Sequence, residues 1–292
     1  MSYLSPIDEY SDFAFRMLCQ RYGAGHTCVP LVNCLALLQG KVSDLDVVPE
    51  EKKLGVQIVG SVPDAIGKAA GIVHEKLPSV SWLNLNCGCP STRTMGSGGG
   101  SAMLSKPEKI IESVREMKKA GLPVSVKLRI KRDAERTASL CQEIESAGAD
   151  FLILHGRSPA QAYRGEADWE TIRFVRERVS IPLIGNGDIK TASEGKEMVK
   201  KGYCHDFMVG RAAMSNPMLF SDKKPESGRV KKKLLDEYIE IHRTHSEPSV
   251  NDVRSKAIHL LSGIKNAARL RDRVGRAGSV DEIIAIADDY SL

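Results

Sequence analysis

The sequence predicts an α/β fold, a closed barrel of eight parallel β-strands followed by a small all-helical domain. Eight short apolar runs recur along the chain, and helical patterns separate most of them. This alternation argues for parallel strands with helical crossovers, and about 250 residues is typical of a closed (β/α)8, or TIM, barrel. The expected strands cover residues 3–6, 27–32, 55–60, 82–86, 124–128, 151–155, 182–186 and 207–210.

Two of the helices between these strands have clear start and stop signals. Ser105-Lys-Pro-Glu108 and Thr191-Ala-Ser-Glu194 each have the spacing of a capping box, which predicts where a helix begins. Gly121 and Gly202 are expected to end these two helices. Further helices are expected over residues 11–21, 63–76, 134–147 and 169–178.

A doubly wound open sheet is the alternative architecture. It would need a glycine-rich dinucleotide-binding turn after an early strand, and the sequence has none. Residues 96–100 are rich in glycine, but they lack the GxGxxG spacing, so we interpret them as a mobile loop. The closed barrel is therefore the better prediction.

The pattern changes after the eighth run. Residues 221–230 contain the Pro, Gly and charged residues that are typical of a linker. Helical patterns follow over 231–245, 250–273 and 280–289, without any strand pattern. We therefore expect a catalytic barrel domain over residues 1–222 and a helical domain over residues 229–292.

The composition limits the class of protein. With 292 residues, 42% hydrophobic and 27% charged, the chain is typical of a soluble globular protein. No apolar run approaches the ~20 residues of a membrane span, so no membrane association is expected. The N-terminus does not resemble a signal peptide. Seven cysteines without regular spacing argue against a disulfide framework and favour a cytoplasmic location.

The net charge of +5 is distributed unevenly along the chain. Residues 223–276 contain 14 Lys and Arg against 7 Asp and Glu, whereas residues 277–292 contain four acids and no base. The basic segment is suited to nucleic acid, although a solvated helical surface would show the same charge. Charge alone does not choose between them.

Cys89 and Lys127 are the first candidates for chemistry, because each lies at or near the end of an expected strand. The strand ends of a parallel barrel surround the mouth that holds the active site. A thiol there can act as nucleophile, general acid or metal ligand, and an inert buried thiol is the alternative. The spacing of the cysteines matches no common zinc or iron–sulfur pattern, so no metal is expected. Lys127 lies inside an apolar strand and would form a Schiff base or stabilise negative charge on a cofactor.

The later strands end in residues that suit an anion. His155 ends the sixth run and is either a core residue or a catalyst. Asn186-Gly-Asp188 and Gly210-Arg211 end the seventh and eighth runs, where barrels commonly hold a phosphate. Glycines let backbone N–H groups approach the anion, and Arg211 supplies charge.

With these residues in place, the chain resembles the tRNA-dihydrouridine synthase family from about residue 3 to residue 220. The resemblance rests on a set of motifs taken together: Ser5-Pro-Ile-Asp-Glu-Tyr-Ser-Asp-Phe-Ala-Phe-Arg16, Val56-Gln57, Asn86-Cys-Gly-Cys-Pro90, Gly98-Gly-Gly-Ser-Ala-Met-Leu104, Val126-Lys-Leu-Arg129, His155-Gly-Arg-Ser-Pro-Ala-Gln-Ala-Tyr-Arg-Gly165, Ala167-Asp-Trp169, Asn186-Gly-Asp188, Val209-Gly-Arg211 and Asn216-Pro217. The tail also looks like the helical RNA-binding domain of the family. Asp8 and Glu9 depart from the pattern, because they stand where the family has small residues.

The resemblance implies the reduction of a uridine C5–C6 double bond in tRNA by FMN, with NADPH as the reductant. Cys89 would give the proton to C5, and Lys127 would stabilise negative charge on the reduced flavin. No obligate protein partner is expected. The residues implied to bind the flavin are Ser5, Pro6, Ile7, Gln57, Asn86, Lys127, His155, Asn186, Gly187, Asp188, Gly210 and Arg211.

Lysines and arginines of the helical tail would offset the cost of flipping the target base out of the folded RNA. The candidates are Lys231, Lys232, Lys233, Arg254, Lys265, Arg269, Arg271, Arg273 and Arg276. Three other functions stay open at this point. They are a flavin barrel that reduces a free pyrimidine-like molecule, a Schiff-base aldolase that uses Lys127, and a non-catalytic RNA-binding protein.

Overall fold

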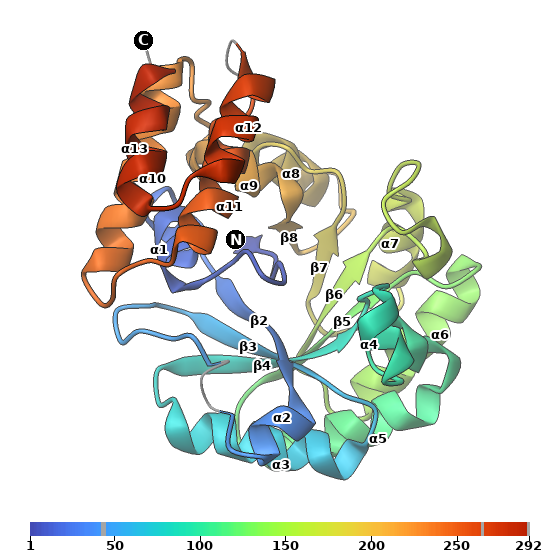
Figure 1. The fold of residues 1–292 in the computed structure, drawn as a ribbon. Helices are drawn as coiled ribbons and strands as arrows, with labels where there is room; N and C mark the ends of the chain where they lie inside the picture. Colours follow the sequence, from blue (N-terminus) through green and yellow to red (C-terminus); the bar gives the residue numbers. More distant parts are fainter. Residues whose placement is uncertain (42–44, 264–265, 291–292) are drawn as a thin grey trace.

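The computed structural model describes residues 1–41, 45–263 and 266–290. Eight parallel strands form one sheet in the order β1-β8-β7-β6-β5-β4-β3-β2. A parallel bridge between Tyr3 and His26 brings the two outer strands together, so the sheet closes into the predicted barrel (Figure 1). The strands are β1 (Ser2–Leu4), β2 (Thr27–Asn33), β3 (Leu54–Val59), β4 (Val80–Cys87), β5 (Val124–Arg129), β6 (Phe151–His155), β7 (Leu183–Asn186) and β8 (Asp206–Val209).

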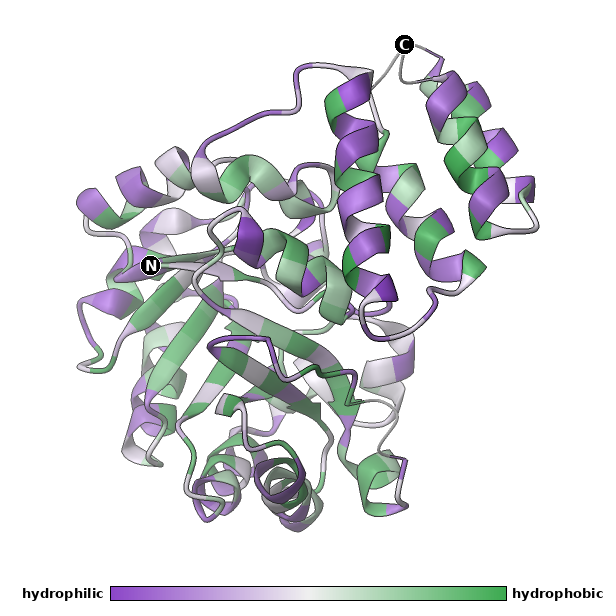
Figure 2. Cartoon of the chain, turned by 90° about the vertical axis from the view of Figure 1, so that its left-hand side faces the viewer, coloured by the Kyte–Doolittle hydropathy of each residue, from purple (hydrophilic) through white to green (hydrophobic). Residues whose placement is uncertain are grey.

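Helices cover the outside of the barrel, where their apolar faces pack on the strands (Figure 2). The helical elements up to residue 221 are α1 (Phe13–Arg21), α2 (Cys34–Leu38), α3 (Pro63–Lys76), α4 (Thr92–Gly96), η2 (Gly100–Ser105), α5 (Pro107–Lys118), α6 (Ala134–Ser146), η3 (Pro159–Gln161), α7 (Trp169–Arg176), α8 (Ala192–Lys200), α9 (Arg211–Ser215) and η4 (Pro217–Ser221). All eight predicted strands are therefore confirmed, together with the helices between them.

The capping signals have mixed outcomes. Thr191 caps α8 as predicted, because its side chain accepts a hydrogen bond from the Glu194 backbone. The capping box at Ser105 is wrong. Lys106 stands at the N-cap of α5 without a side-chain hydrogen bond, and the Ser105 hydroxyl instead donates to the carbonyl of Ala102. Pro107, in the first turn, does mark the start of α5.

The glycine-rich segment forms a short turn between two helical elements, and its mobility stays a prediction. It joins α4 to η2, and Gly100 begins η2 with a φ of 58°. A β-carbon at Gly100 would come within 2.6 Å of the Cys89 carbonyl oxygen and 2.7 Å of the Thr94 methyl carbon. Glycine is needed here because the backbone passes directly behind the cysteine.

The helical tail packs against the barrel beside α1 and α9 (Figure 1). It contains α10 (Gly228–Arg243), α11 (Val250–Leu260), α12 (Ala267–Arg276) and α13 (Val280–Asp289). The prediction of one helix over 250–273 is wrong, because the chain turns after Leu260 and Gly263 has a φ of 73°. Apolar side chains of α1, β8 and the tail form one continuous buried cluster. The division into two domains stays a prediction.

No helix in the described ranges is long and apolar enough to cross a membrane. The seven cysteines are all free thiols, and six of them are buried. Cys89 is the partly exposed one. Among residues 1–41, 45–263 and 266–290, no three His, Cys, Asp or Glu side chains are grouped as a metal site.

Candidate functional site

A cavity of about 730 Å³ opens at the carboxyl ends of the strands. This volume lies in the ordinary range for a small-molecule or cofactor site. Every residue expected to bind or react lines it, although the thirteen come from segments far apart in the sequence: Ser5, Pro6, Ile7, Gln57, Asn86, Cys89, Lys127, His155, Asn186, Gly187, Asp188, Gly210 and Arg211. The structure brings these residues together, and what each of them does stays a prediction.

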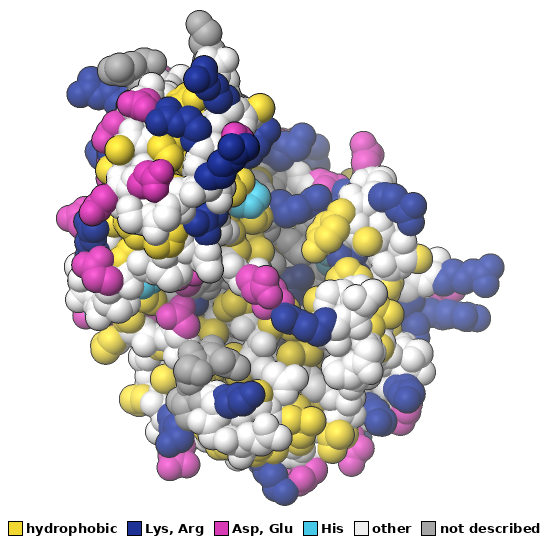
Figure 3. Space-filling model, in the orientation of Figure 1, with side chains coloured by type: hydrophobic (Ala, Val, Ile, Leu, Met, Phe, Trp, Pro, Cys, Tyr) yellow, Lys and Arg dark blue, Asp and Glu magenta, His cyan; other side chains and the backbone are white. Residues whose placement is uncertain are grey.

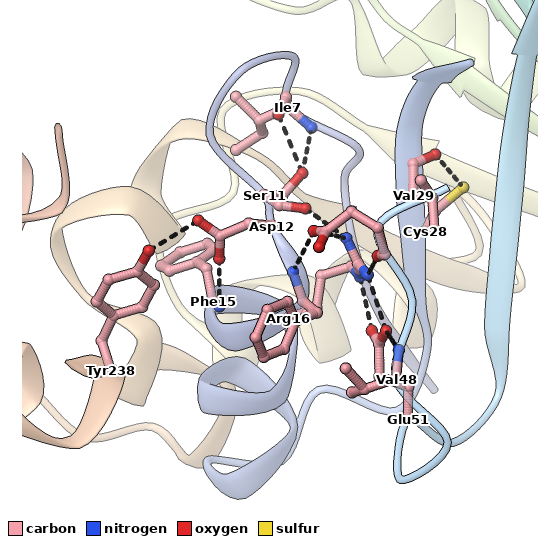
Figure 4. A network of polar contacts seen from close by, with 12 residues as sticks. Ile7, Ser11, Asp12, Phe15, Arg16, Cys28, Val29, Val48, Glu51 and Tyr238 are labelled. Carbon is pink, nitrogen blue, oxygen red and sulfur yellow. Dashed lines mark hydrogen bonds and ion pairs between the residues drawn. The ribbon is translucent and has the colours of Figure 1, made fainter. Parts of the chain in front are cut away.

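The first wall of the cavity is the segment after β1, which a buried ion pair anchors. Arg16 and Glu51 are both fully enclosed, and the Arg16 Nε donates to Glu51 Oε1 at 2.6 Å (Figure 4). Arg16 also donates to the carbonyl oxygen of Ser11 at 2.7 Å. The Ser11 hydroxyl accepts from the Ile7 backbone N–H at 2.9 Å, which completes the turn. Since each partner is satisfied, residues 5–11 are held firmly at the mouth.

Asn86 shapes the loop that carries Cys89. Its side-chain oxygen accepts from the backbone N–H groups of Gly88 at 3.0 Å and Cys89 at 2.9 Å. Its Nδ2 donates to Gln57 at 2.7 Å, and Gln57 in turn donates to Asn84 at 2.6 Å. This amide chain links the neighbouring strands β3 and β4 through buried side chains, so the turn at the end of β4 is fixed from inside the fold.

Lys127 and His155 have pKa values that the fold lowers. Burial lowers the pKa of Lys127 to about 8, and repulsion from Arg129 adds to this effect. Its ammonium donates to the Asn186 side-chain oxygen at 3.3 Å. Burial, with the charges of Lys127, Arg129 and Arg157, lowers the pKa of His155 to about 2. His155 is therefore neutral near pH 7, so it adds no positive charge to the cavity wall.

The cavity is lined by positive charge on the β5–β8 side. Lys127, Arg129, Arg157 and Arg211 all reach it, and Figure 3 shows Lys and Arg side chains beside the hollow between the barrel rim and the tail. The buried Nη1 of Arg157 has no hydrogen-bond partner among the described residues. A buried donor without an acceptor costs free energy, so this wall suits an anionic ligand.

Asp188 is the one acid among these cations. Burial acts to raise its pKa, but hydrogen bonds from Arg157 and the Ala167 backbone outweigh burial and lower it. Its two oxygens lie 2.8 Å from the Arg157 Nη2. The carboxylate is therefore engaged with Arg157, and only its backbone is suited to contact an anion.

The sequence matches the dihydrouridine synthase family over residues 3–283. The chain belongs to this family. A probable tRNA-dihydrouridine synthase of Aquifex aeolicus is 28% identical over 294 residues, which cover 96% of this chain and 93% of the relative. A probable tRNA-dihydrouridine synthase of Rickettsia conorii is 32% identical over 85% of this chain and 72% of the relative. The tRNA-dihydrouridine(20a/20b) synthase [NAD(P)+] of Schizosaccharomyces pombe is 33% identical over 74% of this chain and 67% of the relative.

Solved structures support the barrel of this family member. A 2-naphthoyl-CoA reductase superposes with a TM-score of 0.58 at 12% identity, over 88% of this chain and 55% of that chain. Histamine dehydrogenase from Rhizobium sp. 4-9 superposes with a TM-score of 0.54 at 13% identity, over 80% and 48% of the two chains. At such identities the likeness is one of fold.

Arg129, Arg157 and Tyr163 also line the cavity, although they were missing from the predicted site. Arg129 is 3% exposed and donates to the carbonyl oxygens of Gly88 at 2.9 Å and Ala162 at 2.7 Å, which ties the β4 and β6 loops together. The strand period would have revealed it, because residues 127 and 129 share one face. Tyr163 is 59% exposed, and no periodic signal marks it.

Proposed function

We propose that this protein reduces the C5–C6 double bond of uridine in tRNA to 5,6-dihydrouridine, with FMN as the bound cofactor and NADPH as the reductant. The observation that carries the proposal is the shared cavity. The partly exposed thiol of Cys89 opens onto the same 730 Å³ space as four cationic side chains and the Gly187 and Gly210 turns. A site with one thiol and an anion cradle suits a phosphorylated cofactor and a general acid.

The residues present fit a flavin phosphate. Gly187 has a φ of 133°, and a β-carbon there would lie 2.5 Å from the β-carbon of Ala167, so only glycine fits this turn. A β-carbon at Gly210 would meet nothing closer than the Ser5 side chain at 3.7 Å. Backbone N–H groups of these turns would hold the phosphate, and Arg211 would add charge.

When bound, the reduced flavin supplies a hydride to C6 of the base. Lys127 holds positive charge at the cavity wall and favours negative charge on the ligand beside it. The neutral His155 offers a hydrogen bond without adding to the cationic field. Cys89 gives its thiol proton to C5 of the pyrimidine, which completes the saturation of the double bond.

The test compares two cysteines that lie two positions apart. Cys89→Ala should still bind flavin and be reduced by NADPH, but its dihydrouridine yield should fall by about 100-fold or more. Cys87→Ala is the matched control, because Cys87 is fully buried and does not line the cavity. Dihydrouridine is measured by mass spectrometry of digested tRNA. Normal product formation by Cys89→Ala would refute the role of Cys89.

The RNA substrate is tested separately from the chemistry. Deleting the tail would expose the apolar cluster that it shares with α1, so charge reversal is the cleaner experiment. Of the tail cations proposed to contact RNA, Arg269 and Arg271 are exposed and have no ion pair among the described residues. Lys232, Arg273 and Arg276 are paired with acids, and Lys265 lies outside the described residues.

Arg269→Glu with Arg271→Glu should weaken tRNA binding at least tenfold at 100 mM salt. Each phosphate contact releases counterions from the RNA, so a variant with fewer contacts gains less free energy on binding. Lys68→Glu on α3 is the control, since it reverses one charge on the outer face of the barrel, which is half the charge change of the double variant. Unchanged tRNA binding by the double variant, with activity on free uridine, would favour the small-molecule alternative.

A further inference from the structure

The Cys89 thiol does not stand alone at the cavity. Its Sγ lies 3.5 Å from the Ser91 hydroxyl and 3.6 Å from the Thr94 hydroxyl, both within reach of a sulfur hydrogen bond. The two hydroxyls are 2.9 Å apart, so the three groups form a closed triangle. Thr94 is buried at 7% exposure, whereas Ser91 is exposed to solvent.

We propose that Ser91 and Thr94 form a hydroxyl relay that stabilises the Cys89 thiolate and returns a proton to it from solvent. The inference rests on the proposed function of Cys89 as the proton donor. A donor that acts in every catalytic cycle must recover its proton. The relay gives the sulfur a route to water that does not pass through the substrate cavity.

The loop holds this triangle in place from several sides. The Ser101 backbone N–H donates to the Cys89 carbonyl at 2.9 Å, and the Thr94 backbone N–H donates to the Ser91 hydroxyl at 3.2 Å. Gly100 packs so closely behind Cys89 and Thr94 that a β-carbon would overlap both residues. These contacts fix the backbone that carries Cys89 and Thr94, so the two side chains start from neighbouring positions.

The proton balance of the cycle is simple. The S–H bond of Cys89 breaks and a C–H bond forms at C5 of the base, which leaves a thiolate. Both hydroxyls can then turn and donate to the sulfur, and hydrogen bonds to an anion are about twice as strong as neutral ones. A hydroxyl O–H proton passes to sulfur while a hydronium ion at the exposed Ser91 hydroxyl replaces that proton and is left as water. The only co-reactant is a solvent proton.

A base that fills the cavity covers the side of the thiol that faces the flavin site. Recovery of the proton from that side would have to wait until the product leaves. The Ser91 side stays open to water, because this N-cap residue of α4 is exposed. Reprotonation can therefore begin before product release.

The experiment uses the isosteric variant Thr94→Val, which removes the hydroxyl but keeps the side-chain shape. Thr92→Val is the matched control, because Thr92 is an exposed threonine of the same short helix without a side-chain hydrogen bond among the described residues. Thr94→Ser restores the hydroxyl. The readout is the rate at which iodoacetamide alkylates Cys89 in the flavin-bound enzyme at pH 7, followed by mass spectrometry of the Cys89 peptide.

Thr94→Val should slow alkylation of Cys89 by about three- to tenfold, because the reactive thiolate loses a hydrogen bond, and Thr94→Ser should restore the rate. Single-turnover formation of dihydrouridine should slow by a similar factor, with unchanged flavin reduction by NADPH. Equal alkylation rates in Thr94→Val and Thr92→Val would overturn the relay. Because alkylation needs no tRNA, this result is independent of whether tRNA is the substrate.

Discussion

An ion pair with a buried lysine joins the helical tail to the barrel. Breaking this pair should destabilise the tail and the barrel together. Lys256 of α11 is 1% exposed, and its ammonium lies 2.6 Å from the Asp12 carboxylate. The hydroxyl of Tyr238 donates to the same carboxylate at 2.9 Å (Figure 4). The Lys256 ammonium also lies 4.5 Å from the centre of the Tyr10 ring. This ammonium therefore has an ionic and an aromatic partner but almost no water.

The perturbation is Asp12→Asn, which keeps the side-chain oxygen that caps α1 through the Phe15 backbone. It leaves the Lys256 charge buried without its counter-ion, which costs about 3–5 kcal/mol. Lys256→Met removes the buried charge itself, and we expect it to cost less than about 2 kcal/mol, since the remaining carboxylate keeps two donors. The double variant should therefore be about 2–3 kcal/mol more stable than the sum of the two single effects.

Urea unfolding can separate the tail from the barrel. Trp82 and Trp169 are the two tryptophans of the chain, and both belong to the barrel, so their fluorescence reports on it. Far-ultraviolet circular dichroism reports on all helices, including those of the tail. We expect the two curves to shift together in Asp12→Asn. Additive effects in the double variant, or a shift below about 1 kcal/mol, would refute the reasoning.

Three further predictions concern the cavity and its surroundings. Because Lys127 loses its charge as the pH rises through about 8, flavin affinity measured by fluorescence quenching should fall above pH 8, whereas Lys127→Met should bind weakly and without this pH dependence. Gly55→Ala should cost about 1–3 kcal/mol in thermal unfolding, since its β-carbon would lie 2.3 Å from the Trp82 ring. Asp8→Asn breaks an exposed ion pair with Arg93 and should leave stability unchanged within about 1 kcal/mol, while the loss of one of the two acids beside Arg93 strengthens tRNA binding in filter assays at low salt.

The position of the site was predictable because one rule of the fold controls it. Polar residues at the ends of apolar runs must meet at one mouth once the strands are parallel, and this places Cys89, Lys127, His155 and Asn186 together. The rule needs only the strand period and the strand direction. It says where a side chain lies but not which partner it takes. The engagement of Asp188 with Arg157 is for this reason visible only in the structure.

Other features could not be read from local patterns. The apolar periodicity continues through residues 250–273, yet the chain turns after Leu260, because α12 packs beside α11 and α13. The packing of the tail on α1 likewise depends on contacts between residues more than two hundred positions apart, such as Tyr238 and Asp12. Long-range contacts of this kind have no signal within a window of one helix.

The segment after β1 connects the three parts of the molecule on which the proposals depend. Ser5 lines the cavity, Asp8 pairs with Arg93 beside the Cys89 loop at 3.0 Å, and Asp12 pairs with Lys256 of the tail. These contacts lie within eight residues, and the buried Arg16 anchors them to the barrel. Under the proposed function, an RNA bound to the tail would act on the same short segment that borders the cavity and the Cys89 loop. Of the two ion pairs, the exposed one between Asp8 and Arg93 is the weaker, because the Lys256 ammonium of the other pair is 1% exposed.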